Sequence, residues 1–151
     1  MALFLIIFGL YSCHPGEQES RYHHQMDSLL TELGRMDEKL NKLKIEKVQT
    51  IYDSLALYYD TTDVRDTLQE RHQMLVQSRN ILQWYDNIDR EITFSRSHLR
   101  ALQRQTKNKR LDTVTIQELQ KEKQIVNNLQ QRFDHELKGL RRQIGLLLKK
   151  E

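Results

Sequence analysis

The sequence has almost none of the residues that turn a chain sharply. It contains five glycines and a single proline, Pro15, and no glycine falls between Gly34 and Gly139. Residues 35–138 therefore hold neither glycine nor proline. β-Sandwiches, β-barrels and doubly wound α/β folds need many tight turns, which draw on these residues. The scarcity of glycine and proline argues against all three classes and favours an all-helical protein.

The sequence also lacks the motifs on which common catalytic and metal sites depend. It has one cysteine, no glycine-rich phosphate loop and no G-x-S-x-G nucleophile motif. Its six histidines do not fall in the H-E-x-x-H or Glu-x-x-His spacings that hold zinc or a pair of bridged metal ions. We therefore expect no catalysis, no cofactor, no metal site and no small-molecule substrate.

The N-terminus is apolar and uncharged. Residues 1–12 carry no charge, and the apolar stretch over residues 3–10 is too short to span a bilayer, for which about 20 residues are needed. Its length is typical of the apolar part of a signal peptide. It ends at Leu10-Tyr11-Ser12-Cys13, which resembles the bacterial lipobox, with an aliphatic residue three positions before the cysteine and a small residue directly before it. The resemblance implies a signal peptide over residues 1–12, cleavage before Cys13 and lipidation of Cys13.

A short polar segment follows the cysteine. We interpret residues 13–21 as the lipidated Cys13 and a polar tether. Glu17 and Glu19 resemble the acidic export signals of Bacteroidota surface lipoproteins, and His14 replaces the aspartate that retains lipoproteins in the inner membrane of enteric bacteria. These resemblances imply an outer membrane-anchored lipoprotein on the periplasmic or surface face. The alternative is a short buried apolar N-terminus with an unreactive cysteine.

Apolar residues recur three and four positions apart along the rest of the chain, as they do on one face of a long helix. This spacing predicts helices over about 20–59, 63–106 and 115–150. The breaks fall at the Asp/Thr cluster of residues 60–63 and before a capping-box pattern at Thr115 and Glu118. Helices of similar length with short connections favour antiparallel packing. We therefore predict that residues 22–151 form an all-α, antiparallel up-down-up three-helix bundle with long coiled-coil-like helices; a parallel homo-oligomeric coiled coil is the alternative.

Each predicted helix has an apolar seam. The first is interrupted at Lys47 in a way typical of a stutter, the second slips in spacing at Tyr85, and the third fails only near Lys123. The three seams are, in chain order, Met26, Leu29, Leu33, Met36, Leu40, Leu43, Ile51, Leu55 and Tyr58; Val64, Leu68, Arg71, Leu75, Ser78, Leu82, Tyr85, Ile88, Ile92, Ser95, Leu99 and Leu102; and Ile116, Leu119, Val126, Leu129, Phe133, Leu137, Leu140, Ile144 and Leu147. Arg71, Ser78 and Ser95 make the second seam the least apolar.

A basic stripe with no acidic residue lies between residues 93 and 111. It predicts either a site for an anion, such as a phosphate or an acidic lipid head group, or a face that is neutralised by the acidic starts of the neighbouring helices. The net charge of only +3 and the absence of interleaved aromatic residues argue against nucleic acid as a partner. The basic stripe consists of Arg96, Arg100, Arg104, Lys107, Lys109 and Arg110.

Four aromatic residues are a second candidate site. Tyr58 and Tyr59 lie near the end of the first predicted helix, and Trp84 and Tyr85 lie near the middle of the second. Tyrosine and tryptophan are enriched at the centres of protein interfaces, so these residues predict either a partner-binding patch or part of the bundle core.

Together these features favour a lipid-anchored protein of the cell envelope with a helical body that acts as a structural spacer or a protein-binding module. Its expected partners are the membrane, through the lipid anchor, and another envelope protein or a second copy of the chain. Two alternatives stay open. One is a periplasmic holdase-like chaperone or envelope-assembly factor, and the other is a cytosolic coiled-coil adaptor whose leader is misread.

Overall fold

The computed structural model describes residues 15–61, 68–107 and 112–149, and every regular element in them is a helix. The all-helical class is therefore confirmed. The expected number of helices is wrong, because the first predicted helix is two separate helices, and the structure has four within the described ranges. The helices are α1 (Pro15–Asn41), α2 (Ile45–Thr61), α3 (Leu68–Thr106) and α4 (Thr113–Leu147).

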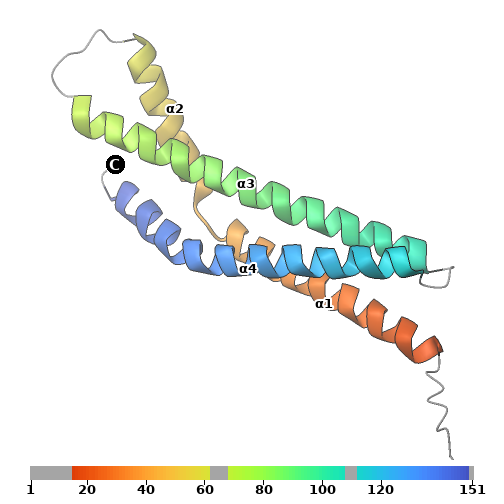
Figure 1. Ribbon diagram of the computed structural model, residues 1–151. Coiled ribbons are helices and arrows are strands. Elements are labelled where there is room, and N and C mark those ends of the chain that lie inside the picture. The colour runs from red at the N-terminus through yellow and green to blue at the C-terminus, as the bar shows by residue number, and fades with distance from the viewer. Residues whose placement is uncertain (1–14, 62–67, 108–111, 150–151) are drawn as a thin grey trace, which may run out of the picture.

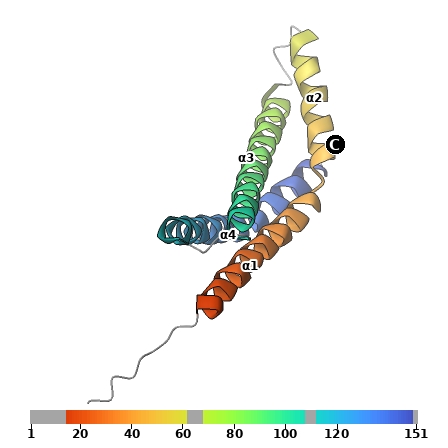
Figure 2. The same ribbon diagram turned by 90° about the vertical axis from the view of Figure 1, so that its right-hand side faces the viewer.

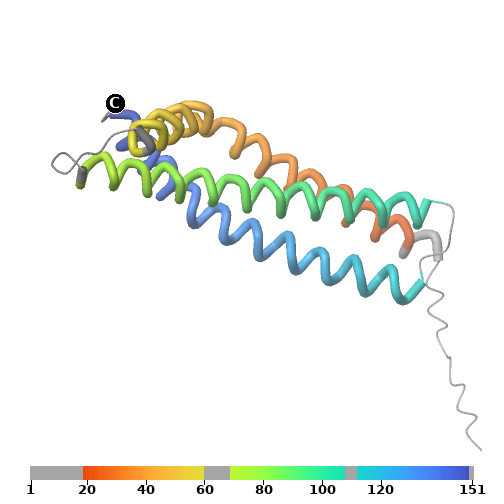
Figure 3. Tube along the Cα trace, turned by 90° about the horizontal axis from the view of Figure 1, so that it is seen from above, coloured from red at the N-terminus to blue at the C-terminus, as the bar shows by residue number. Residues whose placement is uncertain are grey.

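The long helix α3 is the centre of the arrangement. It contacts α1, α2 and α4, and α4 also packs against α1. α1 and α2 lead along the molecule, α3 returns in the opposite direction, and α4 runs the same way as α1 (Figure 3). The starts of α1 and α4 and the end of α3 therefore lie at one pole of the molecule, and α2 and the end of α4 lie at the other (Figure 1). α1 and α4 diverge towards their N-terminal ends in both side views (Figures 1 and 2).

The break between α1 and α2 follows from the register of the apolar residues. An uninterrupted helix would carry Lys47 into the seam after Leu40 and Leu43. Instead, the N–H of Leu43 donates to the carbonyl of Leu40 (3.0 Å) in a tight turn, and α2 begins with a bond from the N–H of Val48 to the carbonyl of Lys44 (3.3 Å). Val48 is then fully buried and Lys47 is exposed. The predicted interruption is real, but the chain breaks the helix rather than unwinding a continuous one.

The apolar side chains form two clusters, one at each end of the molecule. Leu43 and Trp84 pack against both, so the two clusters meet near the α1–α2 break. The larger cluster, between α1, α3 and α4, consists of Met26, Leu29, Leu33, Met36, Leu40, Ile88, Ile92, Leu99, Leu102, Leu119, Val126, Leu129, Phe133 and Leu137. The smaller cluster joins α2 to the start of α3 and the end of α4 and consists of Val48, Ile51, Ile81, Leu140, Ile144 and Leu147.

The seam of α3 differs from the predicted one in its first half. Ile81 is buried and Leu82 is only half-buried. With Ile81 in the seam instead of Leu82, the three- and four-residue spacing continues through Tyr85 without a slip. Arg71, which the spacing placed in the seam, is exposed. Ser78 is buried, and its hydroxyl donates to the carbonyl of Met74 (2.7 Å) one turn earlier. The hydrogen-bonding need of this buried polar residue is thus met within the helix itself.

Two helix starts also differ from the prediction. The N-cap of α4 is Asp112, whose carboxylate accepts from the N–H of Thr115 (2.7 Å), so Thr115 receives the cap instead of supplying it. α1 begins at Pro15, a residue well suited to a first helical position because its missing N–H has no partner to lose there. Most of the segment interpreted as a polar tether is therefore helical. Within the described residues, no helix combines the length and the apolar character needed to cross a bilayer.

Candidate functional site

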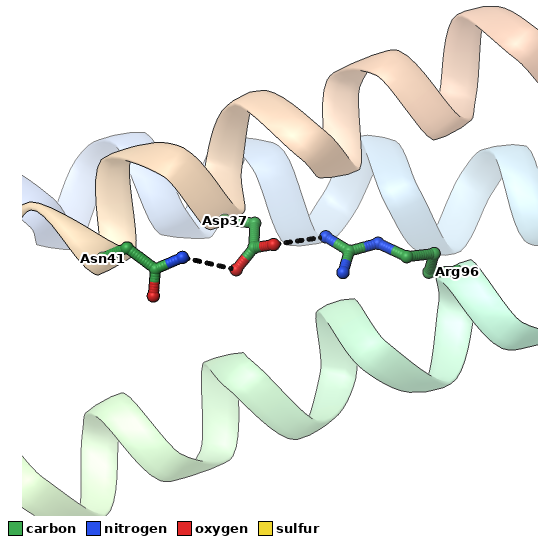
Figure 4. A network of polar contacts seen from close by, with 3 residues as sticks. All are labelled: Asp37, Asn41 and Arg96. Carbon is green, nitrogen blue, oxygen red and sulfur yellow. Dashed lines mark hydrogen bonds and ion pairs between the residues drawn. The ribbon is translucent and has the colours of Figure 1, made fainter.

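The first residue of the basic stripe is held by a neighbouring helix. The guanidinium of Arg96 donates to the carboxylate of Asp37 on α1 (Nη2–Oδ2, 2.7 Å), and Asn41 donates to the other oxygen of that carboxylate (3.2 Å; Figure 4). The side chains of Arg96 and Asp37 are only 25% and 29% exposed. This pair therefore ties α3 to α1, and Arg96 is better explained by packing than by a ligand.

The rest of the basic stripe is open to solvent as far as it is described. Arg100, Arg104 and Lys107 are exposed, and none forms an ion pair with another described residue. Arg104 donates to the carbonyl of Arg100 (3.2 Å). Lys109 and Arg110 lie outside the described residues. The predicted stripe is thus divided into one structural arginine and three exposed cations near the end of α3.

Trp84 and Tyr85 lie against the core. The ring of Trp84 stacks on Phe133 of α4 (centroids 6.2 Å apart, planes at 23°), and its indole N–H donates to the carboxylate of Glu136. Tyr85 is half-buried against the larger cluster. Burial raises the pKa of Tyr85 above its usual value, and the nearby carboxylates Asp89 and Asp37 raise it further. Both residues thus join α3 to its neighbours.

Tyr58 and Tyr59 lie where α2 meets the start of α3. Their rings meet edge to face (centroids 6.0 Å apart). The guanidinium of Arg71 lies over the ring of Tyr58 (4.6 Å), and the ring of Tyr59 meets that of His72 (6.2 Å). These contacts explain why Arg71 is exposed and not part of the seam. Its guanidinium packs over an aromatic ring at the surface.

A buried ionisable pair was missed by sequence reasoning. Glu122 on α4 is 1% exposed, and its Oε2 lies 2.7 Å from Nδ1 of His98 on α3, whose side chain is 37% exposed. The other carboxylate oxygen of Glu122, Oε1, is buried and has no hydrogen-bond partner among the described residues. The spacing contained a signal for this burial, because Glu122 falls three residues after Leu119 and four before Val126.

Three surface grooves stand out among the described residues. The first lies between the N-terminal halves of α1 and α4 and has a volume of about 510 Å³. The second, beside Trp84 on α3 and α4, contains Arg132 and Glu91, which pair with each other. The third, near the start of α3, is lined mainly by amides together with Val76 and His72. Within the described ranges, no cluster of three or more potential metal ligands occurs.

Comparison with known proteins identifies no relative of this chain. No family model, curated protein or solved structure matches it at a significant level.

Proposed function

We propose that this protein is a lipid-anchored spacer of the cell envelope. The observation that carries the proposal is the position of the lipobox-like Leu10-Tyr11-Ser12-Cys13 directly before a long helix, since α1 begins at Pro15. Only His14 separates the cysteine from α1. A lipid on Cys13 would therefore be attached almost directly to the helical body and not through a long flexible tether.

The arrangement of the helices supports a spacer role. The start of α1 lies at the pole where α3 ends and α4 begins, and α2 lies at the other pole (Figure 1). α3 alone has 39 residues, which corresponds to about 58 Å at a rise of 1.5 Å per residue. An anchor at Cys13 would hold the first pole near the membrane and present α2 tens of ångströms away. The exposed Leu57, beside Tyr58 and Tyr59, would then face an envelope partner or a second copy.

Metabolic labelling with radioactive palmitate tests the anchor. We expect the wild type to be labelled and to sediment with outer membranes, and Cys13→Ala to be unlabelled and to be released from them. A substitution outside the motif, Ser20→Ala, should leave labelling unchanged. Equal labelling of the wild type and Cys13→Ala would refute the proposal. An intact N-terminus at Met1 or Ala2 would favour the cytosolic adaptor.

The distribution of exposed apolar side chains favours the spacer over the holdase-like chaperone. Among the described residues, the large exposed ones are distributed over three helices, and Ser78 and Ser95, the polar positions in the α3 seam, are buried. A holdase needs a continuous apolar surface for its clients. Strong binding of a hydrophobic dye to the native protein would favour the chaperone, whereas weak binding is expected for the spacer. The exposed residues are Leu57, Val76, Phe94, Val114, Ile125 and Leu146.

A further inference from the structure

The groove between α1 and α4 differs from the other two in its charge. Arg21 of α1 and Lys123 of α4 line it from the two helices, and no acidic residue is among the described residues that line it. Both side chains are exposed, and neither forms an ion pair with a described residue. Further along the same two helices, by contrast, Lys39 donates to Asp134 (2.9 Å). Two cations that line one groove, with no acidic residue in its described lining, favour the binding of an anion there.

The remaining lining is suited to a ligand with many hydroxyl groups. Each carboxamide offers two donors and one acceptor oxygen, so it can bond to a hydroxyl in either sense. Four carboxamides line the groove, from both helices. They belong to Gln25, Gln120, Gln124 and Asn127.

An aromatic ring completes the groove. Tyr22 is half-buried against the larger apolar cluster and lines the groove beside Arg21. An aromatic ring with an apolar face and a polar tip can pack against the C–H face of a sugar while its hydroxyl remains hydrated. The volume of about 510 Å³ is within the usual range of ligand sites.

We propose that this groove binds a saccharide that carries a phosphate or a carboxylate. Arg21 and Lys123 would hold the anion, and the carboxamides and Tyr22 would hold the sugar rings. A simple inorganic anion would use the cations alone and leave the amides without a role. Arg21 lies six residues after Pro15, about 9 Å along α1. If the chain is anchored as proposed, the groove lies close enough to the membrane to meet the head group of a glycolipid as well as a free envelope glycan.

Binding is tested with the full chain in neutral nanodiscs, by titration with trigalacturonate as the acidic probe and maltotriose as the neutral one. We expect trigalacturonate to bind and maltotriose to bind at least about tenfold more weakly, because a charge-assisted hydrogen bond is worth about 1.5–3 kcal/mol. The double variant Arg21→Gln/Lys123→Gln should lose about tenfold or more in affinity. The matched control Lys138→Gln/Arg141→Gln removes the same charge from exposed positions outside the groove and should change affinity by less than about twofold.

The source of the saccharide is distinguished by changing the nanodisc lipid. Preference for lipid A over phosphatidylglycerol supports a glycolipid head group, and binding of trigalacturonate without that preference supports a free acidic glycan. Equal binding of maltotriose, an equal loss in the control variant, or equal binding of lipid A and phosphatidylglycerol with no binding of trigalacturonate would each overturn the inference. Cys13→Ala should bind trigalacturonate like the wild type, so failure of the anchor and failure of the groove give different results.

Discussion

An ion pair is usually expected to stabilise a fold. The pair formed by Glu122 and His98 leads to the opposite prediction. The carboxylate is 1% exposed, and its Oε1 lacks a partner among the described residues. An unsatisfied buried polar group costs about 1–3 kcal/mol. Its one bond is to a histidine that is 37% exposed, so solvent weakens the attraction. We therefore expect Glu122→Leu to raise the free energy of unfolding by about 1 kcal/mol, since buried ion pairs are often improved by apolar replacements.

Removal of the other partner should have the opposite effect. His98→Ala leaves the Glu122 carboxylate buried with neither oxygen bonded. We expect a loss of about 1–3 kcal/mol, below the 3–5 kcal/mol typical of a fully buried pair, because water can enter where the exposed imidazole stood. In the Glu122→Leu background, His98→Ala should lower the free energy of unfolding much less, because no buried carboxylate then loses its hydrogen-bond partner. The difference between the two costs is the coupling energy of the pair.

Urea unfolding followed by circular dichroism at 222 nm measures all four proteins. With a slope near 2 kcal/mol per molar, the expected loss in His98→Ala lowers the midpoint by about 0.5–1.5 M, and Glu122→Leu raises it by about 0.5 M. The slopes should be equal, which shows that the compared states are the same. If Glu122→Leu and His98→Ala lower the midpoint equally, the pair is a net source of stability and the reasoning from desolvation is wrong.

Three further predictions address the core, a helix interior and pH. Phe133 is fully buried and stacks with Trp84, so Phe133→Ala should lower the free energy of unfolding by about 3–5 kcal/mol in the same urea assay; a loss under 1 kcal/mol would contradict the packing described. A Cβ added to Gly34 meets nothing within 4 Å, so Gly34→Ala should raise the melting temperature through a gain of about 0.5–1 kcal/mol, and a fall would show that the helix is strained there. Because the pKa of Tyr85 is raised from its ordinary 10.0, the protonated phenol stabilises the fold below about pH 10 and this contribution is lost as the pH rises through the raised pKa. Tyr85→Phe should therefore lose less stability than the wild type between about pH 9 and 11 in alkaline titrations, and identical curves would exclude the effect.

The clearest predictions from the sequence were those that depend only on periodicity. In α4 the spacing identified nearly every buried residue, because one uninterrupted helix packed against its neighbours keeps a single face inward. In the first half of the chain the same reasoning predicted one helix where there are two. The apolar residues on both sides of Lys47 were recognised, but the spacing does not say whether the chain unwinds or breaks to bring Val48 inward. That choice depends on how α2 packs against α3 and α4.

The candidate sites were less predictable, because the use of a charged or aromatic side chain depends on its neighbours in space. For the basic stripe, the sequence left open whether it binds an anion or is neutralised by another helix. The structure provides one such partner, Asp37 for Arg96, and leaves Arg100 and Arg104 exposed. The groove that Arg21 lines could not be predicted from the spacing of residues in the sequence, since it forms between two helices, α1 and α4.

Glu122 lowers the stability of the contact between α3 and α4, but it can also favour one alignment of the two helices. Apolar seams with regular three- and four-residue spacing permit several alignments, because a shift by one heptad again places apolar residues face to face. In the observed alignment the carboxylate of Glu122 has a bonding partner, His98. A shift of one heptad in either direction would bring Glu91 or Gln105 to the position of His98, so the carboxylate would meet a like charge or an uncharged amide. The local loss of stability at Glu122 therefore favours the observed register of α3 against α4.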